Sequence, residues 1–521
     1  MCHHRLPIGI QTFSKLREGG FIYVDKTAFI EPLVKGGGYY FLSRPRRFGK
    51  SLFLSTLQSY FEGRRDLFKG LALNSADVDW TPSPVLHFDF NSGTFDDEES
   101  LIEILDSYLA RYESQYGMER GEKSRTAIPV RFGNLLRGVF KQTGSKVVIL
   151  IDEYDKPLLG IEEEKEKFER TQSLLKGFYG NLKSMDAFIR FAFISGVARF
   201  NKVSIFSDVN NLNDISLHNR YADICGWTEE ELVDYFREEI SRMAKEEGVK
   251  SSTLLPKLRS YYDGYLFAPK GHRLYNPFSV LKAFDEERLG MYWFSTGTPT
   301  FLVRRIRKKG IDPSQLNGYQ EKADNLLAVD SVRGNPVALM FQTGYLTIGS
   351  YDSQRSIYEL RFPNYEVEHG FARYLLPMYV PDSVGRKEIF SVLEFENDLY
   401  EGRPEDFLKR LDSLLKDPPY EDRRESTYRG IVYSLCALCT TRPQAERHSY
   451  RGRSDLEVFT DKYLYIFEFK YNRSAVEAMA QIQERDYAGR HALDPRTLYL
   501  IGVNFVTDGA ESTLTYEILR Q

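Results

Sequence analysis

Long apolar runs and cysteines are both scarce in this sequence of 521 residues. No continuous apolar run is longer than the five residues of VVILI at 147–151, and the first residues, MCHHRLPIGIQT, contain no apolar signal core. A membrane-spanning helix needs about 20 apolar residues, so we expect neither a membrane span nor secretion through a signal peptide. Four cysteines in a chain of this length fit a reducing compartment. We therefore expect a cytoplasmic protein without a membrane partner.

A strong net charge and a set of zinc ligands are also missing. The net charge is −4 at pH 7, so a polyanion would have to bind to a local basic patch. The eight histidines form no ligand pattern. Cys436 and Cys439 form a C-x-x-C, but they lie in the apolar stretch GIVYSLCALC and have no second pair. We expect both cysteines in the core rather than at a metal or redox site.

The order of the apolar segments predicts an α/β protein. In the first 215 residues, short apolar runs alternate with helix-like stretches, and the runs are YYFLS (39–43), PVLHFDF (84–90), VVILID (147–152) and IRFAFISGV (189–197). Strands that alternate with helices predict βαβ units and a mainly parallel sheet. Over 216–300 the pattern is helical, and Thr228 with Glu231 predicts a helix N-terminus. Another compact α/β pattern begins near Glu425.

The segment RPRRFGKS (44–51) ends in the way that a phosphate-binding loop ends. In such a loop, backbone N–H groups and a lysine bind the phosphates of a nucleotide, and a Ser or Thr hydroxyl binds Mg²⁺. Here these residues are Lys50 and Ser51, between a predicted strand and the amphipathic stretch SLFLSTLQSYF. The motif G-x-x-x-x-G-K-[ST] requires glycine where this chain has Arg44. A basic surface loop that happens to contain GKS is therefore the alternative.

A second motif stands at the end of VVILIDEYD. Asp152 ends the predicted strand and Glu153 follows it. A strand-end aspartate can hold Mg²⁺, and an adjacent glutamate can orient and activate the attacking water. We expect the strand at 84–90 to be the one that additional-strand ATPases place between the two motifs. Alone, the acidic pair fits an ordinary strand end, but together with Lys50 and Ser51 it favours nucleotide binding.

The tail contains a further constellation, GRSDLEVFTDKYLYIFEFK (452–470). If Asp461 and Lys462 form the turn of a hairpin, Asp455 lies directly opposite Glu468. Two facing carboxylates repel each other unless a cation lies between them, and oxygen ligands favour Mg²⁺ or Mn²⁺ over zinc. Period-2 alternation predicts one face with Leu464, Ile466, Glu468 and Lys470 and another with Tyr463, Tyr465, Phe467 and Phe469. The E-x-K piece alone fits an ordinary cross-strand ion pair.

The sequence resembles the AAA-ATPase-like family of prokaryotic proteins, whose members often carry a C-terminal PD-(D/E)XK nuclease-like domain. The similarity rests on YVDKT (23–27), FLSRPRRFGKSL (41–52), LIDEYDKP (150–157), GVARFNKVSIFSDVNNL (196–212), YYDGY (261–265) and YNPFSVL (275–281). It is weakest over 300–400. RPRRFGKS is the usual form of the loop in that family. The resemblance therefore implies nucleotide binding by Arg44, Pro45, Arg46, Arg47, Phe48, Gly49, Lys50, Ser51 and Asp152, with Glu153 as the catalytic residue.

Three arginines have roles that the sequence does not fix. The resemblance implies that Arg199 senses the γ-phosphate, to which an arginine can make bidentate charge-assisted hydrogen bonds. Without the family, a salt bridge from Arg199 to a surface acid is the simpler interpretation. Arg46 and Arg47 fit a phosphate, a partner subunit or DNA, and the sequence does not choose among these.

The resemblance also assigns the residues of the tail. Asp455, Glu468 and Lys470 match the Asp-x₁₂-Glu-x-Lys core of the PD-(D/E)XK nucleases, in which the carboxylates hold Mg²⁺ and the lysine positions or activates water. Glu425 matches an extra acidic residue on the first helix, and Gln481 matches the helix after the lysine strand. The residue at the proline of the literal motif is Ser454, a departure that the family tolerates. The implied metal ligands are Ser51 and Asp152 at the nucleotide and Glu425, Asp455 and Glu468 in the tail.

These patterns predict an α/β chain with four segments. They are a P-loop additional-strand ATPase domain (1–215), a helical or winged-helix-like lid (216–300), a linking region of uncertain fold (301–385) and a nuclease-like domain (386–521). We expect an ATPase that uses ATP and Mg²⁺, coupled to a nuclease that uses Mg²⁺ or Mn²⁺ on nucleic acid, DNA in preference to RNA. In the alternative, the chain is a nucleotide-gated interaction or signalling protein whose nuclease fold binds without cleaving. The sequence leaves a homo-oligomer open.

Overall fold

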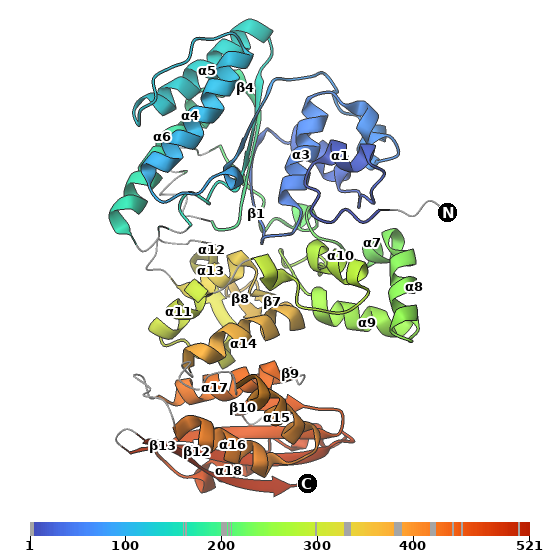
Figure 1. The fold of residues 1–521 in the computed structure, drawn as a ribbon, viewed down its shortest axis with the longest axis vertical. Helices are drawn as coiled ribbons and strands as arrows, with labels where there is room; N and C mark the ends of the chain where they lie inside the picture. Colours follow the sequence, from blue (N-terminus) through green and yellow to red (C-terminus); the bar gives the residue numbers. More distant parts are fainter. Residues whose placement is uncertain are drawn as a thin grey trace. The chain divides into compact units, whose positions relative to one another are not determined.

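The computed structural model shows a mixed α/β protein (Figure 1) and describes residues 5–159, 161, 164–199, 206, 209, 211–296, 300–327, 335–379, 388–416, 424–439, 442–449, 452–508 and 511–521. The chain forms two compact units, Met1–Tyr292 with Glu321–Tyr358 and Trp293–Gln320 with Glu359–Gln521. The linking region expected at 301–385 therefore contributes to both units, and the boundary predicted at 385/386 lies outside the described residues. Within the described parts of the chain, no helix has the length and apolarity needed to cross a membrane.

The four strands predicted in the first unit and a short fifth strand form one parallel sheet. They are β1 (Tyr39–Ser43), β2 (Val85–Asp89), β3 (Val147–Asp152), β4 (Ile189–Gly196) and β5 (Asn213–Asp214), in the order β2-β3-β4-β1-β5. The four strands expected from the apolar runs are confirmed. β1 and β3 are buried along their full length, as expected for central strands of a parallel sheet that is covered on both faces.

The spatial order of the strands corrects one expectation. The strand at 84–90 was expected between the phosphate loop and the acidic motif, but β2 lies at the edge of the sheet. β4 separates the two motif strands instead, and its Ile194 pairs with Phe41 of β1 on one side and with Ile151 of β3 on the other. Order along the chain cannot show this, because a crossover connection can insert a later strand between two earlier ones.

Helices cover both faces of this sheet. Figure 1 shows α4 (Glu98–Gln115), α5 (Ala127–Thr143) and α6 (Lys165–Ser184) on one side and α1 (Phe13–Glu18) with α3 (Lys50–Phe61) on the other; α2 (Ile30–Lys35) precedes β1. On the first side, the rings of Phe132 and Phe178 stack at 4.3 Å and meet Phe88 of β2 edge-on. On the other side, Phe53 of α3 packs against Phe193 of β4 at 5.8 Å.

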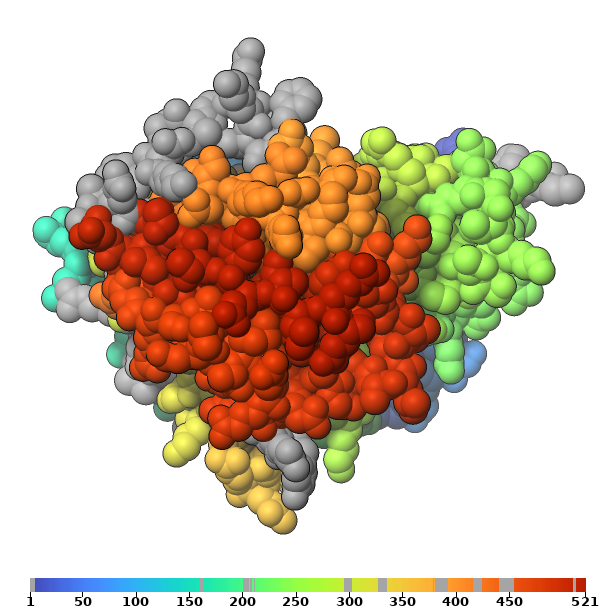
Figure 2. Space-filling view, turned by 90° about the horizontal axis from the view of Figure 1, so that it is seen from below, coloured from blue at the N-terminus to red at the C-terminus, as the bar shows by residue number. Residues whose placement is uncertain are grey.

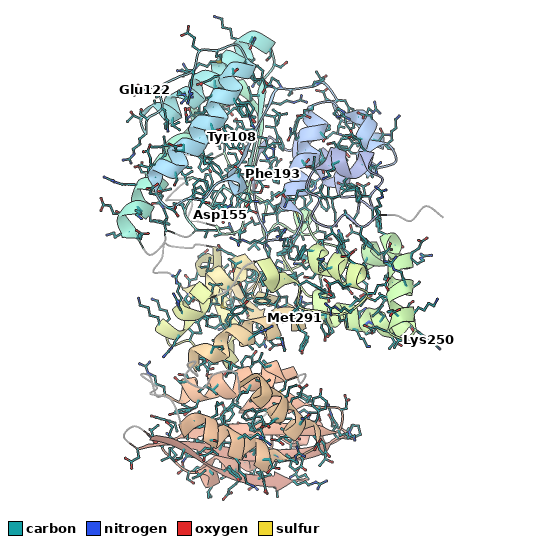
Figure 3. All side chains as sticks on the ribbon, in the orientation of Figure 1. Tyr108, Glu122, Asp155, Phe193, Lys250 and Met291 are labelled. Atoms are coloured by element: carbon teal, nitrogen blue, oxygen red, sulfur yellow. The ribbon has the colours of Figure 1, made fainter. Side chains whose placement is uncertain are left out.

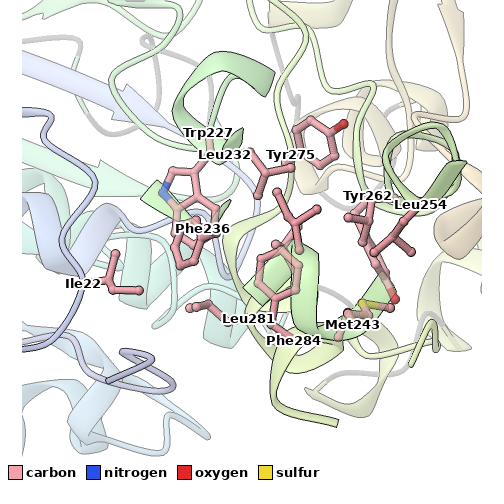
Figure 4. Close-up of a cluster of buried hydrophobic side chains, with 14 of the residues drawn as sticks. Ile22, Trp227, Leu232, Phe236, Met243, Leu254, Tyr262, Tyr275, Leu281 and Phe284 are labelled. Atoms are coloured by element: carbon pink, nitrogen blue, oxygen red, sulfur yellow. The ribbon is translucent and has the colours of Figure 1, made fainter. Parts of the chain in front are cut away.

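The helical pattern expected over 216–300 is confirmed. The helices are α7 (Glu229–Tyr235), α8 (Arg237–Glu246), α9 (Ser251–Tyr262) and α10 (Pro277–Glu286). Thr228 and Glu231 form a capping box at the start of α7, as predicted. The buried faces of these helices meet around Trp227, Phe236 and Phe284, and Ile22 from the N-terminal segment joins the same cluster (Figure 4).

In the described parts of 301–385, whose fold the sequence did not specify, the chain forms helices and a small sheet. The helices are α11 (Thr300–Lys308), α12 (Ala323–Leu327), α13 (Pro336–Thr343) and α14 (Tyr365–Tyr379). The strands are β6 (Tyr319–Lys322), β7 (Thr347–Asp352) and β8 (Ile357–Arg361), in the order β6-β8-β7.

The second unit is built on a mixed five-stranded sheet. Its strands are β9 (Arg442–Ser449), β10 (Gly452–Phe459), β11 (Tyr463–Tyr471), β12 (Thr497–Asp508) and β13 (Glu511–Arg520), in the order β13-β12-β11-β10-β9. The β10–β11 hairpin has the predicted register, and its pairs are Leu456–Phe467, Glu457–Ile466, Val458–Tyr465 and Phe459–Leu464. Only β11 and β12 run parallel among the described strand pairs of this sheet, and α18 (Ala475–Glu484) lies between them in the chain.

The two predicted faces of β11 are confirmed. Leu464 and Ile466 share a buried cluster with Met479 and Ile482 of α18. The aromatic face follows the series Tyr463, Tyr465, Phe467 and Phe469, in which each ring contacts the next. Phe467 on this face also contacts Phe407, which belongs to a layer of helices that packs against this face of the sheet.

That layer consists of α15 (Glu388–Tyr400), α16 (Pro404–Lys416) and α17 (Glu425–Leu438). In Figure 2, residues of α15 and α16, in orange, lie beside the C-terminal strands, in red. Cys436 at the end of α17 and Cys439 just after it are both buried, so the expectation that these cysteines belong to the core is confirmed. Burial raises the pKa of both thiols well above the usual value, which keeps them protonated and unreactive.

Candidate nucleotide and metal sites

The first candidate site lies at the carboxyl ends of β1, β3 and β4. Because these three neighbouring strands are parallel, the segments that follow them meet at one edge of the sheet. The phosphate-loop segment follows β1, and Asp152 ends β3. Nζ of Lys50, which is almost fully buried, lies 3.3 Å from Oε1 of Glu153 and donates a hydrogen bond of 3.2 Å to the carbonyl of Pro45. The fold therefore brings together the two motifs that the sequence singled out separately.

The loop has the backbone conformation of a tight turn into a helix. Gly49 has φ = +93° and directly precedes α3, whose first residues are Lys50 and Ser51. Arg47 also has a positive φ, +68°. A left-handed residue is unfavourable unless it is glycine, so Gly49 meets a real conformational requirement of the turn. The unpaired N–H groups at the start of α3 and its dipole favour an anion at this position.

Arg44, which replaces the motif glycine, holds the loop in place through hydrogen bonds to the backbone. Its buried guanidinium donates hydrogen bonds to four backbone carbonyls, those of Ser43, Ser216, Tyr221 and Ala222. Its Cζ also lies 4.3 Å from the centre of the Phe267 ring. Burial lowers the pKa of Arg44 to about 10, so the group remains charged at neutral pH. The side chain thus connects the loop to the segment after β5, whereas the sequence grouped it with the phosphate ligands.

Of the other side chains in the loop, two are buried and two are exposed to solvent. Pro45 and Phe48 are buried, and the Phe48 ring contacts Tyr265 and Phe267 edge-on. Arg46 and Arg47 are exposed, and the Arg47 guanidinium lies 4.8 Å from the centre of the Phe278 ring. A phosphate, a partner subunit and DNA remain compatible with these two arginines.

Asp152 and Glu153 differ in their environments. Asp152 is buried, and its Oδ1 accepts hydrogen bonds from the hydroxyl of Ser195 on β4 and from the N–H of Glu153 at 3.0 Å. Glu153 has φ = +51°, an unfavourable value for a side chain with a Cβ. Backbone strain of this kind persists where the surrounding structure enforces it, commonly at functional sites. The strain and the contact with Lys50 place the Glu153 carboxylate at the phosphate loop.

Asp155 is a site residue that the sequence analysis missed (Figure 3). Its buried carboxylate accepts hydrogen bonds from the N–H groups of Val197 and Ala198, at 3.1 and 2.6 Å. Burial, and then the negative charge of Glu153, raise the pKa of Asp155 to about 7. A Cβ at Gly196 would lie 2.5 Å from Oδ1 of Asp155, so this close approach requires glycine. Asp155 thereby connects the acidic motif to the segment that carries Arg199.

Arg199, the implied phosphate sensor, is engaged in a salt bridge. Its guanidinium pairs with Asp214 of β5, and both side chains are largely buried. Its backbone N–H donates to Oε1 of Gln342 on α13 at 2.6 Å. The salt bridge that the sequence left as an alternative is therefore present, although its partner is a buried acid. The sensor role stays a prediction.

Replacing Asp155 by Asn is expected to change how stability depends on pH. Folding raises the pKa of Asp155 from 3.8 to about 7, so the folded chain binds this proton more tightly than the unfolded chain. The resulting stabilisation is present below about pH 4 and is lost as the pH rises through 7. Asn keeps an acceptor for the N–H groups of Val197 and Ala198 but stays neutral. The melting temperature of the variant minus that of wild type should therefore increase from pH 5 to pH 8.

The matched control is Asp77→Asn, which makes the same chemical change at a fully exposed position. Its melting difference from wild type should not vary with pH. A difference for Asp155→Asn that is equally constant from pH 5 to pH 8 would contradict the raised pKa.

The second candidate site lies on the β10–β11 hairpin, where the predicted residues do come together. Continuing the observed register by one pair places Asp455 opposite Glu468. Oδ2 of Asp455 accepts a hydrogen bond of 2.8 Å from the N–H of Phe469. Nζ of Lys470 lies 3.0 Å from Oε1 of Glu468 and donates to Oε1 of Gln481 at 2.8 Å. The Gln481 amide also donates to Oε1 of Glu468.

Arg429 of α17 is the main residue of this site that the sequence did not single out. Its guanidinium lies 3.5 Å from Oδ1 of Asp455, 3.5 Å from Oδ2 of Asp312 and 2.5 Å from Oε1 of Glu425. Burial lowers the pKa of Arg429, but the charges of Asp455, Asp312 and Glu425 outweigh it and the pKa is raised. Glu425 is thus paired with an arginine rather than with the hairpin carboxylates. The signal that could have found Arg429 is its spacing of four residues from Glu425 on a predicted helix.

The donor set fits a divalent cation. Oε2 of Glu468 is buried and has no hydrogen-bond partner, which is costly for a carboxylate unless a cation satisfies it. Burial, and then the charge of Asp455, raise the pKa of Glu468 to about 7. Among the described residues, no group of three or more Asp, Glu, His or Cys side chains could hold a metal. Two carboxylates suffice for Mg²⁺, which commonly keeps several water ligands.

The balance of charges around this second site also favours a divalent cation. Asp312, Glu425, Asp455 and Glu468 would carry four negative charges when ionised, and Arg429 and Lys470 supply two positive charges. One divalent cation would neutralise the remainder. Asp455 and Glu468 are the residues that would hold it, while Glu425 is turned toward Arg429.

Comparison with known proteins assigns the two sites to two matched segments. Residues 7–206 match the family model described as "Predicted AAA-ATPase", and residues 423–513 match the model of the PD-(D/E)XK nuclease superfamily. A protein of Azotobacter chroococcum mcd 1, described as an uncharacterized protein in the vnfD 5′ region, is 36% identical over 521 residues, which covers 98% of each chain. Asp312 lies outside both matched segments, although it contacts Arg429.

Proposed function

Because the chain belongs to the AAA-ATPase-like family and carries a C-terminal domain of the PD-(D/E)XK nuclease superfamily, we propose that it is an ATPase that controls a metal-dependent nuclease acting on DNA. The observation that carries the proposal is that Asp455, Glu468 and Lys470 are all present on the hairpin, where Oε2 of Glu468 is buried and has no hydrogen-bond partner. A domain that had lost its activity would be expected to lack at least one of these groups.

At the nucleotide site, each residue has a separate task. Lys50 binds the β- and γ-phosphates, Ser51 and Asp152 hold the Mg²⁺ of the bound nucleotide, and Glu153 orients the attacking water. Lys50 already pairs with Glu153 at 3.3 Å. A triphosphate offers the ammonium several negative charges, so it competes with Glu153 for Lys50. Nucleotide binding would then release the Glu153 carboxylate for its contact with water.

At the nuclease site, Asp455 and Glu468 bind the cation, which when bound polarises the scissile phosphate and lowers the pKa of water. Lys470 is held by Glu468 and Gln481. Its ammonium can donate a hydrogen bond to the attacking water or to a phosphate oxygen. Gln481 fixes the direction of this ammonium, because its amide contacts both Lys470 and Glu468.

One observation favours the alternative, a nucleotide-gated interaction protein that binds nucleic acid without cleaving it. The guanidinium of Arg429 lies 3.5 Å from Oδ1 of Asp455, so a protein cation balances the charge of this carboxylate. The two functions differ in one assay. Purified protein is incubated with plasmid, linear duplex, single-stranded DNA and RNA, with Mg²⁺ or Mn²⁺, with and without ATP. The nuclease proposal predicts metal-dependent cleavage of DNA, whereas binding without cleavage would support the alternative.

Replacing Lys50 by Ala is expected to weaken binding of Mg-ATP by at least tenfold, about 1.4 kcal/mol, because it removes the cation that the loop directs at the phosphates. Calorimetric titration of the variant and of wild type measures this difference. Lys35→Ala is the matched control, since this lysine is half exposed and lies at the end of α2, just before β1. Equal ATP affinity in Lys50→Ala and wild type would rule out the assignment of the loop.

A further inference from the structure

A basic helix in the second unit has no role in the function proposed so far. α11 (Thr300–Lys308) and the residue after it contain the run RRIRKK at 304–309. The sequence contains no Asp or Glu between Glu287 and Asp312. Leu302, Val303 and Ile306 are buried, whereas Arg304, Lys308 and Lys309 are exposed. The helix therefore packs through an apolar face and presents cations to solvent.

This pattern differs from that of another exposed basic helix in the same chain. At the start of α6, each of the cations Lys165, Lys167 and Arg170 lies within 4 Å of a glutamate three or four residues away. Such pairs are common on solvated helices and balance their charge. α11 contains no acidic residue that could form them. The exposed cations Arg304, Lys308 and Lys309 therefore have no acidic neighbour on their own helix, which favours a polyanionic partner.

A series of contacts connects the segment after the basic run with Asp455. A Cβ at Gly310, which follows Lys309, would lie 3.5 Å from Nη1 of Arg424, the exposed residue that precedes α17. Asp312, two residues after Gly310, is buried and contacts Arg429. Arg429 in turn contacts Asp455. The positions of these residues are therefore fixed relative to each other within one unit.

We propose that Arg304, Lys308, Lys309 and Arg424 form a track that binds the phosphate backbone of duplex DNA and guides it to Asp455 and Glu468. Arg304 and Lys308 are four residues apart on α11, roughly 6 Å along the helix axis, so they share one side of the helix and can contact successive phosphates. The track lies largely outside the segment that matches the nuclease superfamily, which begins at residue 423. The α11 segment would thus add a DNA-binding surface to the nuclease domain. This inference rests on the proposed function.

The test measures DNA binding separately from cleavage. Fluorescence anisotropy with a labelled 30-base-pair duplex, in EDTA, compares the full-length wild type with the triple variant Arg304→Gln/Lys308→Gln/Lys309→Gln. The matched control, Lys165→Gln/Lys167→Gln/Arg170→Gln, removes the same charge from exposed positions on α6. Binding is repeated over a salt series, because each lost phosphate contact lowers the slope of log K against log[salt] by about 0.9.

The triple variant is expected to bind the duplex at least tenfold more weakly than wild type, with a salt slope lower by about 2 to 3. The control should stay within twofold of wild type, and adding Arg424→Gln to the triple variant should lower the slope by about one more. Equal affinities of the triple variant and the control would overturn the proposal, and so would tighter binding of duplex RNA than of duplex DNA. Track-dependent binding without any cleavage in Mn²⁺ would support the track while refuting the nuclease function.

Discussion

Replacing Asp455 by Asn is expected to abolish metal-dependent cleavage and to remove most of the stabilisation that Mn²⁺ gives the chain. Asp455 and Glu468 are the two carboxylates that would hold the cation, and Asn supplies a neutral ligand in place of one of them. Loss of supporting residues around a metal already costs 10–100-fold in affinity, so loss of a direct ligand should cost about 100-fold or more.

The expected change can be measured as a stability. A cation that binds only the folded state stabilises it by about 2.7 kcal/mol at a concentration of one hundred times Kd. If the substitution raises Kd 100-fold, the same concentration gives only about 0.4 kcal/mol. Melting of wild type and Asp455→Asn with and without Mn²⁺, together with calorimetric titration of Mn²⁺, measures the loss without any nuclease assay. ATP binding at Lys50 should be unchanged.

Asp461→Asn is the matched control for this experiment. It makes the same substitution on the same hairpin, at an exposed position of the turn between β10 and β11. It should retain both cleavage and the Mn²⁺-dependent shift. Cleavage at the wild-type rate by Asp455→Asn, or a wild-type chain whose melting does not respond to Mn²⁺, would show that the hairpin carboxylates are not a metal site.

Replacing Glu153 by Gln is expected to slow ATP hydrolysis by roughly 10²-fold or more while ATP remains bound. Gln keeps the size of the side chain but cannot accept a proton, and general-base catalysis typically contributes 10²–10⁴-fold to a rate. Lys50 loses its ionic partner in this variant, so its ammonium becomes more available to the phosphates. The affinity for ATP should therefore be equal to that of wild type or higher.

Phosphate release and calorimetric titration of the same preparations separate these two effects. Glu166→Gln, on the exposed side of α6, is the control and should hydrolyse ATP at the wild-type rate. Undiminished hydrolysis in Glu153→Gln would place the catalytic base elsewhere. A parallel loss of ATP binding would mean that Glu153 supports the loop rather than the chemistry.

The strands and the hairpin could be predicted because their signals are local. β1 and β3 are apolar runs that end at polar residues, and both were found with their observed bounds. The register of the hairpin, which places Asp455 opposite Glu468 when it is continued by one pair, follows from two facts that the sequence contains, the two-residue turn at 461–462 and the period of two along a strand. Local patterns thus sufficed for the core of the second site.

Contacts between distant segments could not be predicted in this way. Arg44 was grouped with the phosphate ligands because of its place in the loop, but its donors face the carbonyls of Ser216, Tyr221 and Ala222. Asp312 contacts Arg429 of the tail although it precedes that residue by more than one hundred positions. Burial and hydrogen-bond partners of this kind depend on the tertiary fold, and a single sequence shows neither.

The most direct test of the central claim is whether one chain couples its two sites. The initial rate of plasmid cleavage is measured in Mn²⁺, with and without ATP, for wild type, Lys50→Ala and Asp455→Asn. We expect wild type to cleave at a rate that changes with ATP, Lys50→Ala to cleave at a rate that does not, and Asp455→Asn not to cleave. A wild-type rate that ATP leaves unchanged, or no cleavage of any DNA substrate in either condition, would contradict an ATP-controlled nuclease.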